Sequence, residues 1–124
     1  MKKRILVADD EILVRQLVRA ALEGPALAVD EAADGVAALG LFDEGAYDLV
    51  ISDMRMPRLD GLGLLAAVRR RIPEQPFMLI SAAFDRPPQP RDGVVFMGKP
   101  FELDEFVDRV EDLLESVPAV GVFH

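Results

Sequence analysis

The chain of 124 residues contains no cysteine, which excludes disulfides, thiolate metal sites and a cysteine nucleophile. Its single histidine, His124, is the last residue, and we expect it to take no part in the chemistry. No apolar run approaches the roughly 20 residues that a membrane-spanning helix needs. We therefore expect a soluble, cytoplasmic protein without membrane insertion, whose reactive groups are carboxylates, hydroxyls and amines.

Positive charge is also scarce, because 14 Lys and Arg residues face 22 Asp and Glu residues, for a formal net charge of −8. Contacts to phosphates of nucleic acid need clustered Lys and Arg, so the composition argues against direct nucleic-acid binding. Hydrophobic residues nevertheless make up 51 % of the chain, enough for the core of one domain. We expect that domain to cover residues 1–117, followed by a loosely ordered tail over 118–124.

Short apolar runs alternate along the chain with segments of helical period. The runs typical of buried strands cover residues 4–8, 27–32, 47–52, 76–81 and 94–97. Apolar residues recur at helical spacing over residues 11–23, 35–44, 62–71 and 103–114. Strands that alternate with helices predict an α/β fold with a parallel sheet and right-handed crossovers.

One segment breaks this alternation. Residues 84–93, between the fourth and fifth predicted strands, contain Pro87, Pro88 and Pro90 and show no apolar period. Proline in a helix interior removes a hydrogen bond and costs about 3 kcal/mol, and it also pushes the preceding residue out of the helical region. We therefore predict no regular helix here, or at most a single turn.

Charged side chains follow three of the predicted strands at the point where each strand ends. Asp9 and Asp10 come directly after the first strand, Asp53 after the third and Lys99 after the fifth. Because the carboxyl ends of parallel strands meet at one edge of a sheet, we expect these groups to lie close together. Clustered carboxylates repel one another, and a divalent cation and a nearby ammonium group would relieve that repulsion.

These motifs resemble the receiver domain of bacterial two-component response regulators, over residues 3–116. The motifs that carry the resemblance are Asp9-Asp10, Asp53 with Met56-Pro57 and Asp60-Gly61, Ser81, and Lys99-Pro100-Phe101. The resemblance implies a flavodoxin-like five-stranded parallel sheet of order 2-1-3-4-5, flanked by helices. Residues 76–84 also resemble, more loosely, a single-domain subgroup whose fourth helix is degenerate, which agrees with a missing or very short helix between strands 4 and 5.

The resemblance also implies a role for each site residue. Asp53 would be the phosphoacceptor, taking a phosphoryl group from the phosphohistidine of a histidine kinase or histidine phosphotransfer protein. Asp10, Asp53 and the backbone carbonyl of Arg55 would hold Mg²⁺, and Asp9 would act mainly through a water. Lys99 would contact the phosphoryl group or, in its absence, pair with Asp53.

A switch would follow from phosphorylation. Ser81 would donate its hydroxyl to a phosphoryl oxygen, and Phe96 would change rotamer in response, which would alter the surface around strands four and five. The output would be a contact with a downstream protein that the sequence does not identify. Ser81 is alternatively an ordinary serine at a strand end, and core packing explains Phe96 nearly as well as switching.

Structural roles are also open for other residues of the motifs. Asp9 and Asp10 could cap the helix that follows them, since aspartate is favoured at such positions. Lys99 could be a surface lysine. Asp60 and Gly61 are expected to be structural, as a cap and a flexible turn that open the third helix.

The leading hypothesis is therefore a phosphoacceptor switch in a histidine–aspartate relay. It is not an enzyme, because it assists only its own phosphorylation and dephosphorylation. The alternative is an adaptor of the same fold that binds partners independently of phosphorylation, which the missing helix suggests. A Mg²⁺-dependent phosphohydrolase is a third hypothesis, and it is disfavoured because Arg55 stands two residues after Asp53, where a second acidic residue would be needed.

Overall fold

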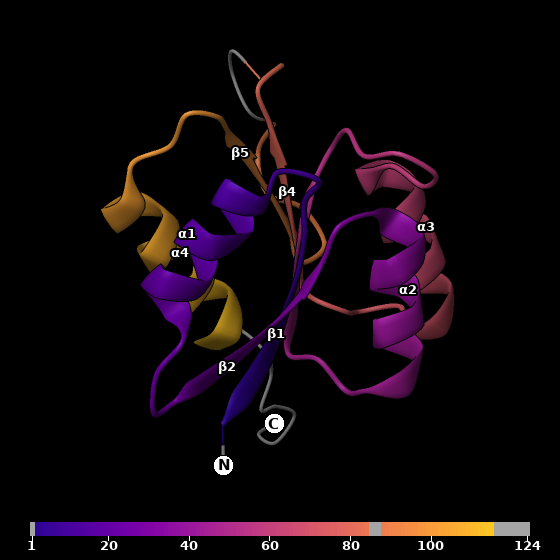
Figure 1. Cartoon of the computed structure of the whole chain (residues 1–124), viewed down its shortest axis with the longest axis horizontal. Helices are drawn as coiled ribbons and strands as arrows, with labels where there is room; N and C mark the ends of the chain where they lie inside the picture. Colours follow the sequence, from indigo (N-terminus) through magenta and orange to yellow (C-terminus); the bar gives the residue numbers. More distant parts are fainter. Residues whose placement is uncertain (1, 85–87, 116–124) are drawn as a thin grey trace.

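The computed structural model describes residues 2–84 and 88–115 and contains five strands and four helices in that part of the chain. In chain order they are β1 (Lys3–Ala8), α1 (Ile12–Leu22), β2 (Leu27–Ala32), α2 (Gly35–Glu44), β3 (Leu49–Asp53), α3 (Gly61–Arg71), β4 (Phe77–Ser81), β5 (Val94–Gly98) and α4 (Leu103–Glu115). The strands form one parallel sheet of order β2-β1-β3-β4-β5, as predicted (Figure 1). The tail expected over 118–124 lies outside the described residues.

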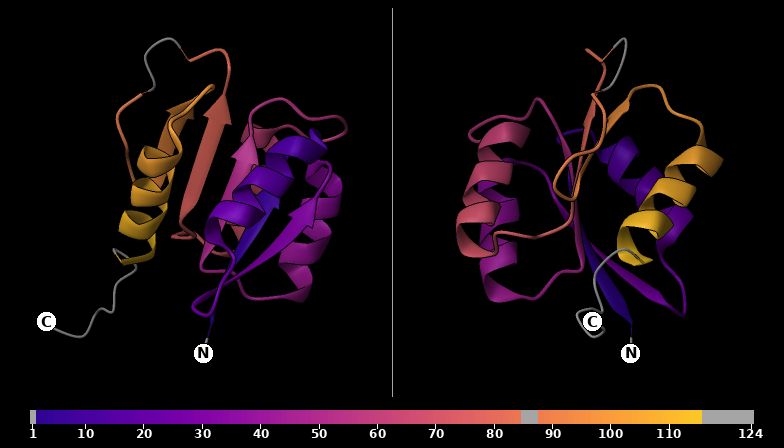
Figure 2. Two further views of the ribbon diagram at one scale, coloured as in Figure 1. Left: turned by 60° about the vertical axis from the view of Figure 1, so that its left-hand side comes forward. Right: turned by 180° about the vertical axis from the view of Figure 1, so that it is seen from behind.

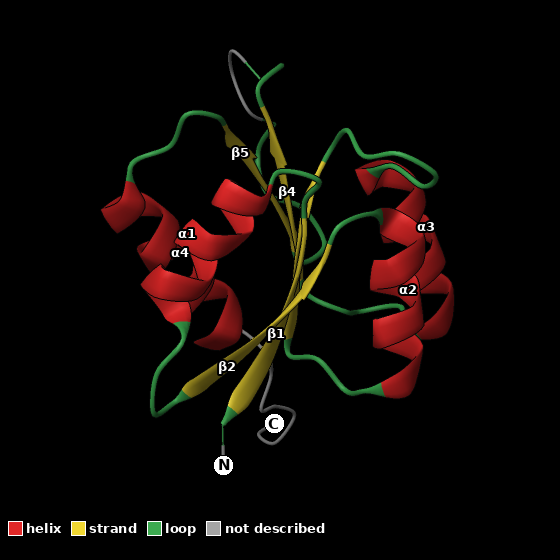
Figure 3. Cartoon of the chain, in the orientation of Figure 1, coloured by secondary structure: helices red, strands yellow, loops and turns green. Residues whose placement is uncertain are grey.

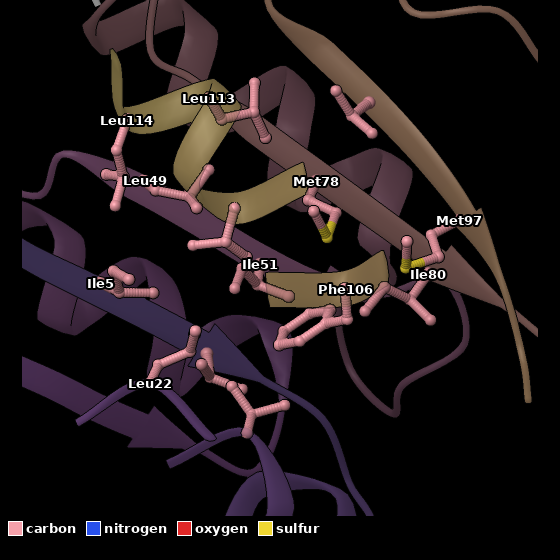
Figure 4. Packing of buried hydrophobic residues seen from close by; sticks show 14 of the residues in the cluster. Ile5, Leu22, Leu49, Ile51, Met78, Ile80, Met97, Phe106, Leu113 and Leu114 are labelled. Atoms are coloured by element: carbon pink, nitrogen blue, oxygen red, sulfur yellow. The ribbon is translucent and has the colours of Figure 1, made fainter. Parts of the chain in front are cut away.

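Helices cover both faces of the sheet. α1 and α4 lie on one face and α2 and α3 on the other, which gives three layers (Figure 3). Alternate residues of each strand point to opposite faces, so the chain builds one apolar cluster under each helix pair. In the cluster under α1 and α4, Ile51, Met78 and Phe106 are at most 1 % exposed (Figure 4). In the cluster under α2 and α3, Phe77 and Leu79 are fully buried.

The central strand β3 ends in the phosphoacceptor candidate Asp53, at the edge of the sheet where the carboxyl ends of the strands lie. All five of its residues are buried, because helices cover it on both faces and strands flank it on both sides. The sequence predicts that this strand ends at Ser52, but it continues to Asp53, which pairs in register with Ile80 of β4. Asp53 is therefore held by the sheet and does not belong to the following loop.

Helix ends agree with the local chemistry of the sequence. Asp60 precedes α3, and its Oδ1 accepts a hydrogen bond of 2.8 Å from the backbone N–H of Gly63, so the predicted cap is confirmed. Asp34 caps α2 in the same way through the N–H of Ala37, at 2.7 Å. In the described ranges, none of the helices has the length and apolar character that crossing a membrane requires.

The connection from β4 to β5 contains no helix in its described residues, 82–84 and 88–93, as the prolines predict. In Figure 2, residues 88–93 of this connection form an extended trace that leads to the start of β5. It ends in a tight turn in which Arg91 and Val94 exchange two backbone hydrogen bonds. Asp92 and Gly93 occupy the centre of this turn with φ of 53° and 78°, the left-handed pair that a type I′ turn requires.

A side chain of α3 secures this turn. Arg69 donates hydrogen bonds to the carbonyl of Gln75, at 2.9 Å, and to the carbonyl of Asp92, at 2.7 Å. Two carbonyls from the start of β4 and the start of β5 therefore share one guanidinium group. This contact ties the turn before β5 to the chain before β4.

Candidate functional site

Three carboxylates gather at the carboxyl edge of the sheet. Asp9 and Asp10 come from the turn between β1 and α1, Asp53 from the last position of β3, and one oxygen of each lies within 4.8 Å of the others. Asp9 is only 2 % exposed and Asp53 only 9 %, whereas Asp10 faces solvent. A donor set made only of carboxylate oxygens, with one side open to water, suits a hard divalent cation such as Mg²⁺.

Lys99 places its ammonium group among these carboxylates. Its Nζ lies 3.1 Å from Asp9 Oδ2, 3.3 Å from Asp53 Oδ1 and 3.4 Å from Glu11 Oε1, and its side chain is 15 % exposed. Burial opposes the charged form, but the hydrogen bond and charge of Asp9 and the charge of Asp53 outweigh it, so the pKa of Lys99 is raised. The expected pair with Asp53 is present, but Asp9 and Glu11 share the same ammonium group.

The electrostatic environment disfavours a charged Asp53. Burial is the main cause and the neighbouring charge of Asp9 the second, and together they raise the pKa of Asp53 against the opposing effect of Lys99. A carboxylate in this position gains from any further positive charge that reaches it. The site is therefore suited to a divalent cation on chemical grounds as well as by its geometry.

The loop between β3 and α3 is held against the rest of the domain by close backbone contacts. The N–H of Gly61 donates to the carbonyl of Met54 at 2.8 Å, and a Cβ at position 61 would lie 2.4 Å from the carbonyl oxygen of Asp53. Arg58, with φ of 71°, donates to Asp34 at 2.6 Å. Asp34 therefore fixes this loop to the start of α2 while it also caps that helix.

A cavity of about 510 Å³ opens beside the carboxylates. The residues that line it are Asp10, Glu11, Asp53, Arg55, Ser81, Ala82, Ala83 and Lys99. Apart from Asp9, which lies beneath them, and Phe96, the residues predicted for the site all border this one cavity. Arg55 is exposed on its rim, and the use of its backbone carbonyl as a cation ligand stays a prediction.

Ser81 and Phe96 lie on neighbouring strands and on the same face of the sheet. Ser81 ends β4, is 3 % exposed, and accepts a hydrogen bond of 3.0 Å from the N–H of Ala83 through its Oγ. Phe96 pairs in register with Leu79, two residues before Ser81. Its half-buried ring packs edge-to-face on Phe84, with centroids 5.9 Å apart. This placement suits both core packing and a switching role, and the switching role stays a prediction.

The suggestion that Asp9 or Asp10 caps α1 is wrong. The residue at the cap position is Glu11, whose side chain makes no capping hydrogen bond. Asp9 Oδ1 instead accepts the N–H of Glu11 at 2.9 Å, in the turn just before the helix, while Oδ2 faces Lys99. The carboxylate of Asp9 is thus used at the site and is not available to the helix.

Sequence reasoning missed two residues that contact the site. Glu11, which binds Lys99, continues the acidic run and could have been found from its position. Arg15 could not, because a cation in the second turn of an amphipathic helix carries no local signal. Its guanidinium donates to the backbone carbonyl of Asp9 at 2.8 Å and to Glu31 at 3.1 Å.

Comparison with known proteins agrees with this geometry. Residues 5–111 match the family model of the response regulator receiver domain. The chain is 37 % identical over 120 residues to the sensor kinase CckA of Brucella abortus, covering 90 % of this chain and 12 % of the kinase. It is 35 % identical over 126 residues to the response regulator MprA of a Mycobacterium species, covering 92 % of this chain and 51 % of that regulator.

A solved structure extends the likeness to three dimensions. The receiver domain of the Francisella response regulator 1452 aligns with a TM-score of 0.79 at 29 % identity, covering 92 % of this chain and 98 % of that domain. The chain therefore spans 12 % of the kinase and about half of MprA, but it matches nearly the whole of a separate receiver domain.

Proposed function

The chain belongs to the response regulator receiver family, and from that premise we propose that it is a phosphoacceptor switch in a histidine–aspartate relay. The observation that supports this most is the group of Asp9, Asp10 and Asp53, of which Asp9 and Asp53 pair with the ammonium of Lys99. The donor is a phosphohistidine on a histidine kinase or on a histidine phosphotransfer protein. The relay operates in the cytoplasm, and the domain modifies only itself, so it is a regulatory protein and not an enzyme.

Transfer uses Asp53 as the nucleophile. A carboxylate oxygen forms a bond to phosphorus while the N–P bond of the phosphohistidine breaks. The electron pair of that bond returns to the imidazole ring, which takes up a proton from solvent. Asp53 borders the cavity and ends a buried strand, so its carboxylate is held still where a donor can reach it.

Two further side chains stabilise the phosphoryl group after transfer. The ammonium of Lys99 lies 3.3 Å from Asp53 and keeps its charge, so it can pair with a phosphoryl oxygen. The hydroxyl of Ser81 accepts a backbone N–H, which leaves its own hydrogen free to donate. When that hydrogen turns towards the phosphoryl group, the packing of Phe96 changes, and the altered surface contacts a downstream protein.

The residues present fit Mg²⁺, since three carboxylates with oxygens within 4.8 Å would otherwise repel. Asp10, Asp53 and the carbonyl of Arg55 would hold the ion directly, and Asp9 through a water. When bound, the ion offsets the negative charge of the carboxylates and of the phosphoryl oxygens.

The test is phosphorylation by a small donor. Intact-mass analysis after incubation with Mg²⁺ and acetyl phosphate should show one phosphoryl adduct, sensitive to hydroxylamine as acyl phosphates are. Asp53→Asn should abolish the adduct, whereas Asp108→Asn, an exposed aspartate on α4, should leave it unchanged. The absence of any adduct with several donors would refute the proposal, and equal partner binding by wild type and Asp53→Asn would favour the phosphorylation-independent adaptor.

A further inference from the structure

Arg15 lies outside the proposed phosphorylation chemistry, yet it contacts the backbone that carries two of the carboxylates. We propose that Arg15, held by Glu31, is a positioning residue that sets the cation affinity of the site through the carbonyl of Asp9. This inference rests on the proposed function, because it concerns the same cation site.

Arg15 joins three segments of the fold. It belongs to α1, and one of its terminal nitrogens donates to the carbonyl of Asp9, in the turn after β1, at 2.8 Å. Its Nε donates to Glu31 Oε1, near the end of β2, at 3.1 Å. The side chain of Arg15 is 14 % exposed and that of Glu31 is 23 % exposed, so solvent weakens these contacts less than it weakens surface pairs.

A contact to the Asp9 carbonyl can fix the conformation of the turn that carries Asp9 and Asp10. The peptide unit that contains it is planar and leads directly to Asp10, so its orientation sets where the Asp10 side chain begins. The N–H of Asp9 is already fixed, because it donates to the carbonyl of Ala32 at 3.1 Å. With Arg15 on the carbonyl, the backbone of Asp9 is held at both of its polar groups.

Arg15 contacts the site without competing for the carboxylate oxygens. Its contact with the site is to a backbone carbonyl, so the carboxylates of Asp9 and Asp10 remain available to a cation. Groups that orient ligands in this indirect way typically change metal affinity by about 10- to 100-fold when they are removed.

A second arginine of α1 provides a matched control. The Nε of Arg19 donates to the other oxygen of Glu31 at 2.7 Å, and one terminal nitrogen donates to the carbonyl of Val29 at 2.7 Å. Arg19 therefore has the same helix, the same charge and the same carboxylate partner as Arg15. Its remaining contact is with Glu23, the residue that follows α1, and none of these bonds reaches Asp9.

The experiment is calorimetric titration of Mg²⁺ into the full chain and its variants. We expect Arg15→Gln to bind Mg²⁺ about 10-fold more weakly than wild type. Glu31→Gln should show a smaller loss in the same direction, and Arg19→Gln should stay within about twofold of wild type, because it leaves the Asp9 carbonyl contact in place. Arg15→Lys, which keeps the charge and one donor, should recover part of the affinity. Urea unfolding without Mg²⁺ checks that each variant is folded. If Arg15→Gln is unfolded, the comparison is made between Arg15→Lys and Arg19→Gln.

Three outcomes overturn the inference. Arg15→Gln could bind Mg²⁺ as tightly as wild type, or Arg19→Gln could lose as much affinity as Arg15→Gln. Either result, with a wild-type protein that binds Mg²⁺ and is phosphorylated, rejects the role of Arg15 and leaves the proposed function standing. If the wild-type protein itself binds no Mg²⁺, the proposed function and this inference fail together.

Discussion

Replacing Gly35 by alanine tests whether a backbone contact shapes the loop after the phosphoacceptor. Gly35 is the first residue of α2, and a Cβ built there would lie 2.1 Å from the carbonyl oxygen of Leu59 and 2.7 Å from its Cβ. Real Cβ atoms are essentially never found so close to a neighbour. Leu59 cannot relieve the contact by turning a side chain, because the nearest atom is backbone. Either α2 or the loop must move.

The size of the effect follows from this clash and from a control in the same helix. Overpacking at a buried contact costs about 1–3 kcal/mol in the free energy of unfolding. Gly40 lies in the interior of α2, exposed and with nothing within 4 Å of its built Cβ, so Gly40→Ala should stabilise by about 1 kcal/mol. The two variants should therefore differ by about 2–4 kcal/mol, with opposite signs relative to wild type.

Urea unfolding followed by far-ultraviolet circular dichroism measures this difference. With a slope of about 2 kcal/mol per M for a domain of this size, the two midpoints should lie about 1–2 M apart. If Gly35→Ala were as stable as wild type, or were stabilised as much as Gly40→Ala, the close approach of Leu59 to α2 would not hold the loop, and the reasoning would be refuted.

Two further predictions concern other parts of the fold. Hydrogen bonds from Tyr47 and Arg4 hold the pKa of Asp30 below its ordinary value of 3.8, so the stabilisation they give is present at neutral pH and is lost as the pH falls below about 4. The urea midpoint of wild type should therefore fall more steeply between about pH 5 and pH 3 than that of Asp30→Asn, and parallel curves would contradict this. Gly93 has φ of 78°, so Gly93→Ala should destabilise the domain by about 1 kcal/mol, measured by urea unfolding. Gly24→Ala, which meets open space, is the control, and equal midpoints for the two variants would show that the turn tolerates a side chain.

Much of the fold could be predicted from the sequence because its signals are local. Apolar runs of strand length alternating with helical periods imply parallel strands, and parallel strands bring Asp9, Asp53 and Lys99 to one edge whatever their separation in the chain. The prolines before β5 indicate a lost helix by a steric argument that needs no tertiary information.

The contacts that organise the site could not be predicted in this way. Arg15 reaches the carbonyl of Asp9, Arg58 reaches Asp34, and Glu11 shares Lys99 with two other carboxylates. Each contact depends on the direction of a long side chain and on the distance between two packed elements. Hydrophobic periodicity predicts neither of these. The alternative in which Asp9 or Asp10 caps α1 fails for the same reason, because the preference of aspartate for helix starts does not account for the competing attraction of a distant lysine.

Because β4 pairs directly with β5, the sheet itself places Lys99 beside Ser81. Lys99 and Ser81 are linked through the N–H of Lys99 and the carbonyl of Ser81, 3.0 Å apart, and through the ladder that precedes them. The chain between them contributes no helix in its described residues. Ala82 and Ala83 line the site cavity, but residues 88–93 do not. Residues 88–93 can therefore vary in sequence while the link that holds Lys99 beside Ser81 is kept.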